Sequence, residues 1–228
     1  MKKLFMLAVM ALSTVIAKAQ YEPGTFSIQP KAGFNIAWLS DMDKLPIGLT
    51  SGLDKMPTVG AVVGVECEFQ VAKMLGIAAG LGYSMQGTAW EDYTDEDKLS
   101  GKDTKYKDTK IETGYITVPV TANIYLAKGL AIKSGVQFGF LTNADFKNTT
   151  EGTLDKRDLT VSTSVDMKDD FNTVDISIPI GLSYEFKNHI VIDGRYNLGL
   201  SNVWKDDHSS DKSKNNVVML TVGYKFGL

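Results

Sequence analysis

Few residues of this 228-residue chain have types and spacing that could support catalysis or metal binding. The single cysteine, Cys67, excludes an intrachain disulfide framework and a multi-cysteine zinc site. His208 stands among aspartates and serines at 206–210, but adjacent residues of a polar loop rarely form a catalytic triad. The acidic run 92–97 could attract Ca²⁺, yet it lacks the glycine and glutamate spacing of an EF-hand loop. We therefore expect no enzyme activity, no metal site and no cofactor.

Charged residues recur instead within segments that alternate between apolar and polar residues. All of them fall on the polar side of the alternation: Lys31, Glu66, Glu68, Lys133, Asp175, Glu185, Asp193, Arg195 and Lys225. Charges taken out of water have to pair or become neutral. If the polar side faces the inside of a narrow tube, this pattern predicts a network of ion pairs and hydrogen bonds that fills the tube. We favour that interpretation over a path for protons or solutes.

Eight segments carry this period-two alternation, which is typical of β-strands. Short turns are expected at 71–74, 127–129 and 187–189, and long polar loops at 40–57, 91–110, 147–172 and 205–215. Strands of roughly 11–14 residues match the ~9–11 residues that cross a bilayer at a tilt. The pattern predicts an all-β fold, an eight-stranded antiparallel up-and-down transmembrane β-barrel. The strands are expected at 26–38, 59–70, 75–86, 115–126, 130–140, 174–186, 190–201 and 216–226.

A soluble lipocalin-like barrel would alternate in the same way with its apolar side inward, so the side that faces out has to be decided. The polar side is rich in glycine, which weakens strands but suits the crowded interior of a small barrel. The apolar side therefore predicts lipid contact. Its aromatic residues are expected at the two membrane interfaces: Trp38, Phe69, Tyr83, Phe140, Tyr184, Phe186, Tyr196, Tyr224 and Phe226.

Three prolines interrupt this scheme. Pro30, Pro119 and Pro179 fall inside predicted strands, where each removes one donor from the hydrogen-bond ladder. We expect local β-bulges to accommodate them.

The first nineteen residues have the features of an export signal. Two lysines precede an almost unbroken apolar run of 13 residues, and Ala17-Lys18-Ala19 provides small residues before Gln20. The run is too short to span a bilayer as a helix. We expect cleavage after residue 19, a barrel domain over 20–228, and a location in the cell outer membrane. The net charge of −3 argues against a nucleic-acid partner.

Five short motifs follow one another along the predicted strands: residues 31–35 (KAGFN), 83–87 (YSMQG), 115–120 (YITVPV), 195–200 (RYNLGL) and 223–226 (GYKF). In this order they resemble the small outer-membrane β-barrel family of Bacteroidetes-type bacteria, which includes the PorT-like proteins. The resemblance implies the fold, the location and recognition by the barrel-assembly machinery. It transfers no catalytic residue.

Several functions remain open at this point. The first is a structural or surface-interaction protein, held in outer-membrane lipid, whose long loops contact a protein or surface ligand. The alternatives are a narrow porin-like pore, a PorT-like secretion accessory factor and a soluble lipocalin-like ligand-binding barrel. Apolar and polar residues also alternate over 159–167, within the longest loop. This pattern predicts a strand above the membrane, which is our candidate contact surface.

Overall fold

The computed structural model describes residues 22–40, 55–97, 102–154, 157–205 and 212–228. The predicted signal at 1–19 and the His208 loop lie outside these residues. No helix of the described residues is long and apolar enough to cross a membrane. Within the described ranges the elements are strands apart from one 3-10 turn, η2 (Lys168–Asp170). The strands are β1 (Phe26–Leu39), β2 (Lys55–Ala72), β3 (Leu75–Trp90), β4 (Tyr93–Asp97), β5 (Lys102–Ala127), β6 (Leu130–Leu154), β7 (Arg157–Asp166), β8 (Val174–Glu185), β9 (Ile190–Gly199), β10 (Asn215–Tyr224) and β11 (Phe226–Gly227).

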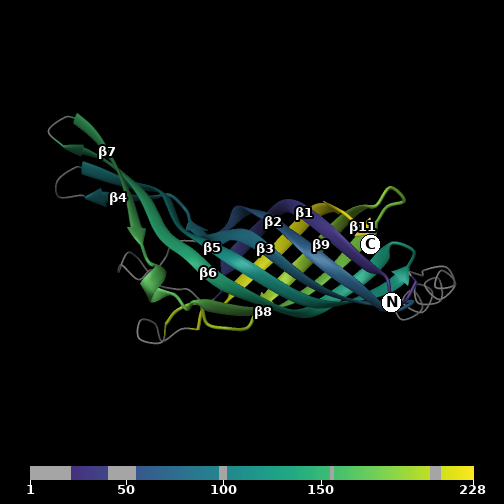
Figure 1. The fold of residues 1–228 in the computed structure, drawn as a ribbon. Helices are drawn as coiled ribbons and strands as arrows, with labels where there is room; N and C mark the ends of the chain where they lie inside the picture. The colour runs from purple at the N-terminus through teal and green to yellow at the C-terminus, as the bar shows by residue number, and fades with distance from the viewer. Residues whose placement is uncertain (1–21, 41–54, 98–101, 155–156, 206–211) are drawn as a thin grey trace, which may run out of the picture.

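Eight of these strands close into a ring. The hydrogen-bonded order is β1, β2, β3, β5, β6, β8, β9 and β10, and β10 pairs back with β1. All the pairings are antiparallel, and the three short turns join β2 to β3, β5 to β6 and β8 to β9. Figure 1 shows the resulting barrel, whose end with the short turns we call the turn end and whose other end we call the loop end. The predicted fold is confirmed.

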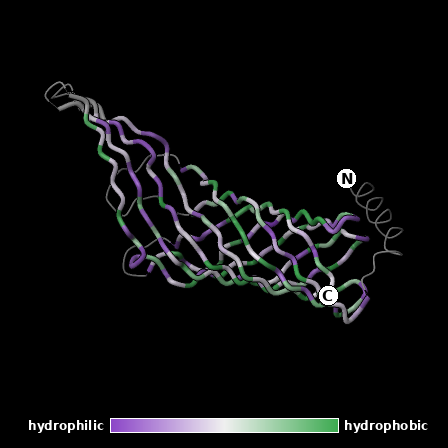
Figure 2. The backbone as a smooth tube through the Cα atoms, turned by 45° about the horizontal axis from the view of Figure 1, so that its top comes forward, coloured by the Kyte–Doolittle hydropathy of each residue, from purple (hydrophilic) through white to green (hydrophobic). Residues whose placement is uncertain are grey.

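The apolar side of the alternation faces outward. Phe34, Val63, Leu81, Leu182 and Val222 are at least half exposed, although they belong to the central parts of strands. Polar and charged side chains of the opposite parity are buried inside the ring. Hydrophobic residues gather along the barrel strands in Figure 2. This is the reverse of a lipocalin, so the lipocalin-like alternative is not favoured.

Two of the predicted long loops are wrong in part, because they contain strands. β5 and β6 have 26 and 25 residues, well beyond the predicted 11–14. Their far ends pair with each other and with β4 and β7. We call this four-stranded sheet the arm; it comprises β4, β7, residues 102–114 of β5 and residues 143–154 of β6. In Figure 1 it projects from the loop end of the barrel.

The arm begins where a bulge interrupts the β5–β6 pairing. The register shifts between Gly114 and Tyr115, and Thr142 is the extra residue on β6. The hydroxyl of Thr142 donates to the carbonyl oxygen of Gly114 at 2.9 Å. Bulges bend the strand that carries them, which accounts for the change of direction at this point. The predicted strand within 159–167 is confirmed as β7, except that Met167 lies beyond its end.

The bulges expected at the prolines are wrong. The strand register before Pro30, Pro119 and Pro179 is the same as the register after them, so no residue is inserted. At each proline, however, the ladder with one of the two neighbouring strands lacks two successive pairs. The ladder opens there because proline has no N–H to donate. The opposite neighbour keeps each strand in place, since all three prolines remain paired on that side. The opening at Pro30 also separates β10 from β11.

Candidate functional site

A cluster of five charged side chains crosses the middle of the barrel lumen. Four strands supply it: Lys31 from β1, Glu66 from β2, Lys133 from β6, and Asp193 and Arg195 from β9. Glu66 accepts from Lys31 at 2.7 Å, from Arg195 at 3.3 Å and from Lys133. Asp193 accepts from Arg195 at 2.9 Å and from Lys133 at 3.0 Å. We call these residues the central cluster. Its three cations and two carboxylates are buried.

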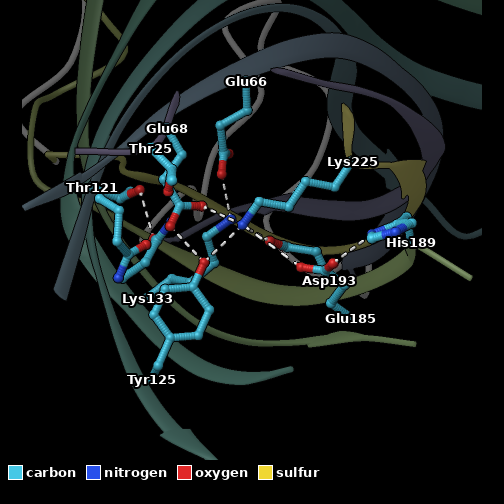
Figure 3. A network of polar contacts seen from close by, with 12 residues as sticks. Thr25, Glu66, Glu68, Thr121, Tyr125, Lys133, Glu185, His189, Asp193 and Lys225 are labelled. Carbon is cyan, nitrogen blue, oxygen red and sulfur yellow. Dashed lines mark hydrogen bonds and ion pairs between the residues drawn. The ribbon is translucent and has the colours of Figure 1, made fainter. Parts of the chain in front are cut away.

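A second polar group lies toward the turn end, as Figure 3 shows. The ammonium of Lys225 lies 3.1 Å from a Glu68 carboxylate oxygen and 3.7 Å from one of Glu185. It also donates to the hydroxyl of Tyr125 at 2.9 Å, and that hydroxyl donates to Glu68 at 2.5 Å. His189 lies beside Glu185 at 3.1 Å. We call these five residues the turn-end cluster.

Two inward-facing glycines make room for the side chains in the lumen. A Cβ added to Gly76 would lie 2.1 Å from a carboxylate oxygen of Glu68. A Cβ added to Gly135 would lie 2.0 Å from the carbonyl oxygen of Val120 on the neighbouring strand. Both distances are shorter than any real contact, so a side chain at Gly76 would displace the Glu68 carboxylate, and one at Gly135 would require the neighbouring backbone to move. The glycine-rich polar side thus has a steric cause.

Asp175 takes part in neither cluster. It lies near the loop end of the lumen, where it accepts from the hydroxyl of Ser201 at 2.5 Å and from the amide of Asn215 at 3.4 Å. Asn215 in turn donates to Gln86. The nine predicted lumen charges are therefore distributed over three levels of the barrel. Eight belong to the two clusters, and this one is held by neutral donors.

Apolar side chains, which the sequence analysis did not anticipate, fill the loop end. They come from the ends of β1 and β3, from β5 and β6, and from the segments after β7 and β9. The rings of Phe171 and Trp204 pack with their centroids 4.3 Å apart. The backbone amide of Asn172 donates to Val203 at 2.8 Å, which joins the two segments. We call this group the apolar cap; it consists of Leu39, Trp90, Ile111, Tyr115, Leu141, Ala144, Phe146, Met167, Phe171, Val203 and Trp204.

Outward-facing charges mark the base of the arm. Toward the loop end, the outward positions of β5 change from apolar at Ile116 to charged at Glu112 and Lys110. Glu112 accepts from Lys110 at 2.7 Å and from Lys147 at 2.5 Å. These two hydrogen-bonded ammonium groups hold the pKa of the Glu112 carboxyl below its ordinary value, and Glu112 raises the pKa of Lys147. We call the belt of outward-facing apolar residues around the barrel the apolar band. The charges at Glu112 and Lys110 indicate that this band ends between Ile116 and Glu112.

The predicted interface aromatics are found on the outer surface at both ends. Tyr184 packs edge-on against Phe186 at 4.8 Å, and Tyr224 packs against Phe226 at 4.6 Å. Together with Phe69, these residues lie near the turn end, in strands except for Phe186, which directly follows β8. Toward the loop end Trp38 stacks on Tyr196 at 6.2 Å, and Tyr83 and Phe140 are exposed. Their contact with lipid headgroups stays a prediction.

A cavity of about 370 Å³ opens at the turn end. Its polar lining comes from Glu22, Thr25, Ser27, Glu68, Gln70, Glu185, His189 and Lys225. The hydroxyl of Thr25 donates to the backbone carbonyl oxygen of Glu22 at 2.8 Å and not to a side-chain base. Within the described ranges no group of three or more His, Cys, Asp or Glu side chains is arranged to hold a metal ion. The absence of enzyme activity stays a prediction.

Sequence reasoning missed two members of the turn-end cluster. Tyr125 has the inward parity of its strand, and its ring also lies 5.4 Å from the Lys225 ammonium. That parity was the available signal. His189 belongs to the short turn after β8, where alternation carries no information. The apolar cap was missed because its residues come from segments that look unrelated along the chain.

A family model described as outer membrane protein beta-barrel domain matches residues 18–205. Similar solved structures include Ail, the attachment invasion locus protein of Yersinia pestis, with 14% identity, coverage of 90% of this chain and 100% of that chain, and a TM-score of 0.41. Neisserial surface protein A has 13% identity, coverage of 88% and 97%, and a TM-score of 0.41. OprG from Pseudomonas aeruginosa has 14% identity, coverage of 92% and 99%, and a TM-score of 0.40. No curated protein matches the chain.

Identities this low are no evidence of a shared function. The family model is stronger evidence than these structural similarities, because it matches most of the chain and describes the barrel that the eight strands form. The chain therefore belongs to the outer membrane protein beta-barrel domain family.

Proposed function

We propose that this outer-membrane barrel is a surface-interaction protein, which contacts its partner through the arm and conducts no solute through its lumen. The observation that carries the proposal is the contrast between the two parts of the molecule. Buried ion pairs from four strands join across the lumen, and apolar side chains fill its loop end. The arm instead extends polar strands beyond the apolar band.

An eight-stranded barrel is only wide enough for its own side chains or one small ligand. Opening a solute path through this lumen would require the central cluster to separate. Breaking such a buried charge network costs about 3–5 kcal/mol for each partner removed. The porin-like alternative therefore has a specific energetic obstacle.

Current recordings on the reconstituted full chain in planar bilayers test the closed lumen. We expect no discrete conductance steps at moderate voltage. Steps that recur with one unit size would establish a pore and overturn this part of the proposal.

The position of the arm is tested by labelling intact cells with a membrane-impermeant maleimide. The background variant Cys67→Ser removes the natural cysteine, and Thr163→Cys places a thiol on exposed β7. Asn188→Cys, in the short turn between β8 and β9, is the matched control. We expect Thr163→Cys to react on intact cells and Asn188→Cys to react only after permeabilisation. The opposite pattern would overturn the proposal.

Two further expectations belong to this proposal. The outward apolar band would contact outer-membrane lipid, and the barrel-assembly machinery would insert the chain. A PorT-like role as a secretion accessory stays a prediction, since the matching family model is the broader one.

A further inference from the structure

The arm is a sheet with two edge strands, and these two strands differ in sequence. β4 forms one edge and pairs with β5, while β7 forms the other and pairs with β6 from Asp145↔Asp166 to Leu154↔Arg157. Among the described residues no strand pairs with the far side of either. Free edges can recruit strands of other chains, so most proteins protect them with charges, prolines or bulges.

β4 carries charges, whereas β7 carries them only at its two ends. Three of the five β4 residues are acidic, in the run Asp95-Glu96-Asp97. Residues 159–165 of β7 contain neither a charge nor a proline, and the register with β6 continues through them without a bulge. The edge of the arm formed by β7 is thus the one open to strand addition.

The hydrogen-bonding groups on that open edge can be identified. The amide of Met167 donates to the carbonyl oxygen of Ala144 at 2.8 Å, in register with the β6–β7 pairs. In an antiparallel ladder the residues facing the partner strand alternate. The N–H and C=O groups of Thr160, Ser162 and Ser164 therefore face away from β6, toward the open edge.

The side chains of β7 favour a particular kind of added strand. Leu159, Val161 and Val165 share one face and are 48%, 58% and 48% exposed. Neighbouring strands align residues of the same face side by side, so apolar residues opposite these three would bury apolar area. A charged residue there would lose hydration without finding a partner.

We propose that the open edge of β7 binds an extended, uncharged segment of a partner protein outside the cell, whose apolar residues alternate, by β-strand addition. The inference rests on the proposed function, because it requires the arm to lie outside. A second copy in the same membrane does not suit this edge. Its arm would point the same way, so the two β7 strands would run in one direction and could form only a parallel pair, which is less stable per residue than an antiparallel one.

The probe is a fluorescent peptide, acetyl-KTVTVTVTK-amide, titrated onto the full chain in lipid nanodiscs. Its seven central residues are uncharged and represent the proposed segment, and the two terminal lysines only keep the peptide in solution. Its control carries N-methyl groups on the threonine amides. In an antiparallel pair with the valines beside Leu159, Val161 and Val165, these amides face β7, so the control blocks the hydrogen-bonding edge and leaves the side chains unchanged. We expect saturable binding of the first peptide and at least tenfold weaker binding of the second. Equal binding of both would overturn the proposal.

Variants of Ser162 locate the binding. Ser162→Pro removes an amide that faces the open edge, while Ser162→Ala removes only the hydroxyl that contacts Thr149 at 3.3 Å. We expect at least tenfold weaker binding for the first and unchanged binding for the second. Ser162→Lys, which keeps the amide and adds an edge charge, should also weaken binding if the proline variant does not fold. Unchanged binding by folded Ser162→Pro, or by Ser162→Lys where the proline variant does not fold, would overturn the proposal.

Two results separate this inference from the proposed function. If the peptide fails to bind although Thr163→Cys is labelled on intact cells, strand addition is wrong and the surface position of the arm stands. If the wild-type chain forms dimers that Ser162→Pro abolishes, the occupant is a second copy and the assignment to a partner protein is wrong.

Discussion

Glu66 is the residue on which the central cluster depends most. Its two carboxylate oxygens accept from Lys31, Lys133 and Arg195. Glu66→Gln has nearly the same shape but leaves three buried cations with Asp193 as the remaining carboxylate. Lys31→Met is the matched comparison, because Lys31 contacts Glu66 alone within the cluster. That change reduces the cluster from three cations to two and leaves every other contact in place.

The two variants should therefore differ in cost. Leaving buried charges without their counter-ion destabilises a protein by about 3–5 kcal/mol. Losing one hydrogen bond whose acceptor keeps other donors costs about 0.5–1.5 kcal/mol. We expect Glu66→Gln to lower the free energy of unfolding by at least ~1.4 kcal/mol more than Lys31→Met does. This is a tenfold difference in the equilibrium constant of unfolding.

Urea unfolding in phospholipid bilayers measures this difference. Tryptophan fluorescence would follow the transition, and gels of unboiled samples would report the fraction that remains a folded barrel. Equal stabilities of the two variants, or a Lys31→Met variant less stable than Glu66→Gln, would refute the reasoning. Such a result would mean that water reaches the lumen and screens the charges.

Three other perturbations test the cap, the lumen and the arm. Phe171→Ala should cost about 3–5 kcal/mol through the cavity it leaves, visible as faster amide exchange around the loop end. Gly135→Ala should destabilise the barrel by about 1–3 kcal/mol in urea unfolding, whereas Gly152→Ala, whose added Cβ would meet only the Thr104 hydroxyl at 4.0 Å, should be neutral. The lowered pKa of Glu112 means that its ion pairs stabilise the arm above the ordinary value of 4.5 and are lost as the pH falls through the folded value. Because the Glu112 side chain is partly exposed, at 27%, and its partners Lys110 and Lys147 lie at the surface, the effect should stay below about 1 kcal/mol and should decrease with salt, as amide exchange of 104–112 against pH would show.

The strands of the barrel could be predicted because their signal is local. A period of two records which side of the sheet each residue occupies, and apolar residues on one side with glycines and charges on the other also decide which side faces lipid. The short turns divide these segments without ambiguity. The nine charges of the lumen were therefore found from parity alone.

The arm could not be predicted in the same way. Residues 102–110 carry no apolar alternation, so they have the appearance of a loop. What holds them as a strand are contacts across the sheet, such as the ion pair at 2.7 Å between Lys107 and Glu151. The sequence does not show such pairs, because their members are far apart in the chain.

Sequence alone determined the number of barrel strands, their inner and outer sides and the inward position of the charges. Tertiary structure decided which charge meets which, why Asp175 joins neither cluster, and how Phe171 and Trp204 meet to fill the loop end. The physical reason is that alternation is a property of one strand. A salt bridge across the lumen is a property of the closed ring, and it exists only when β10 pairs with β1.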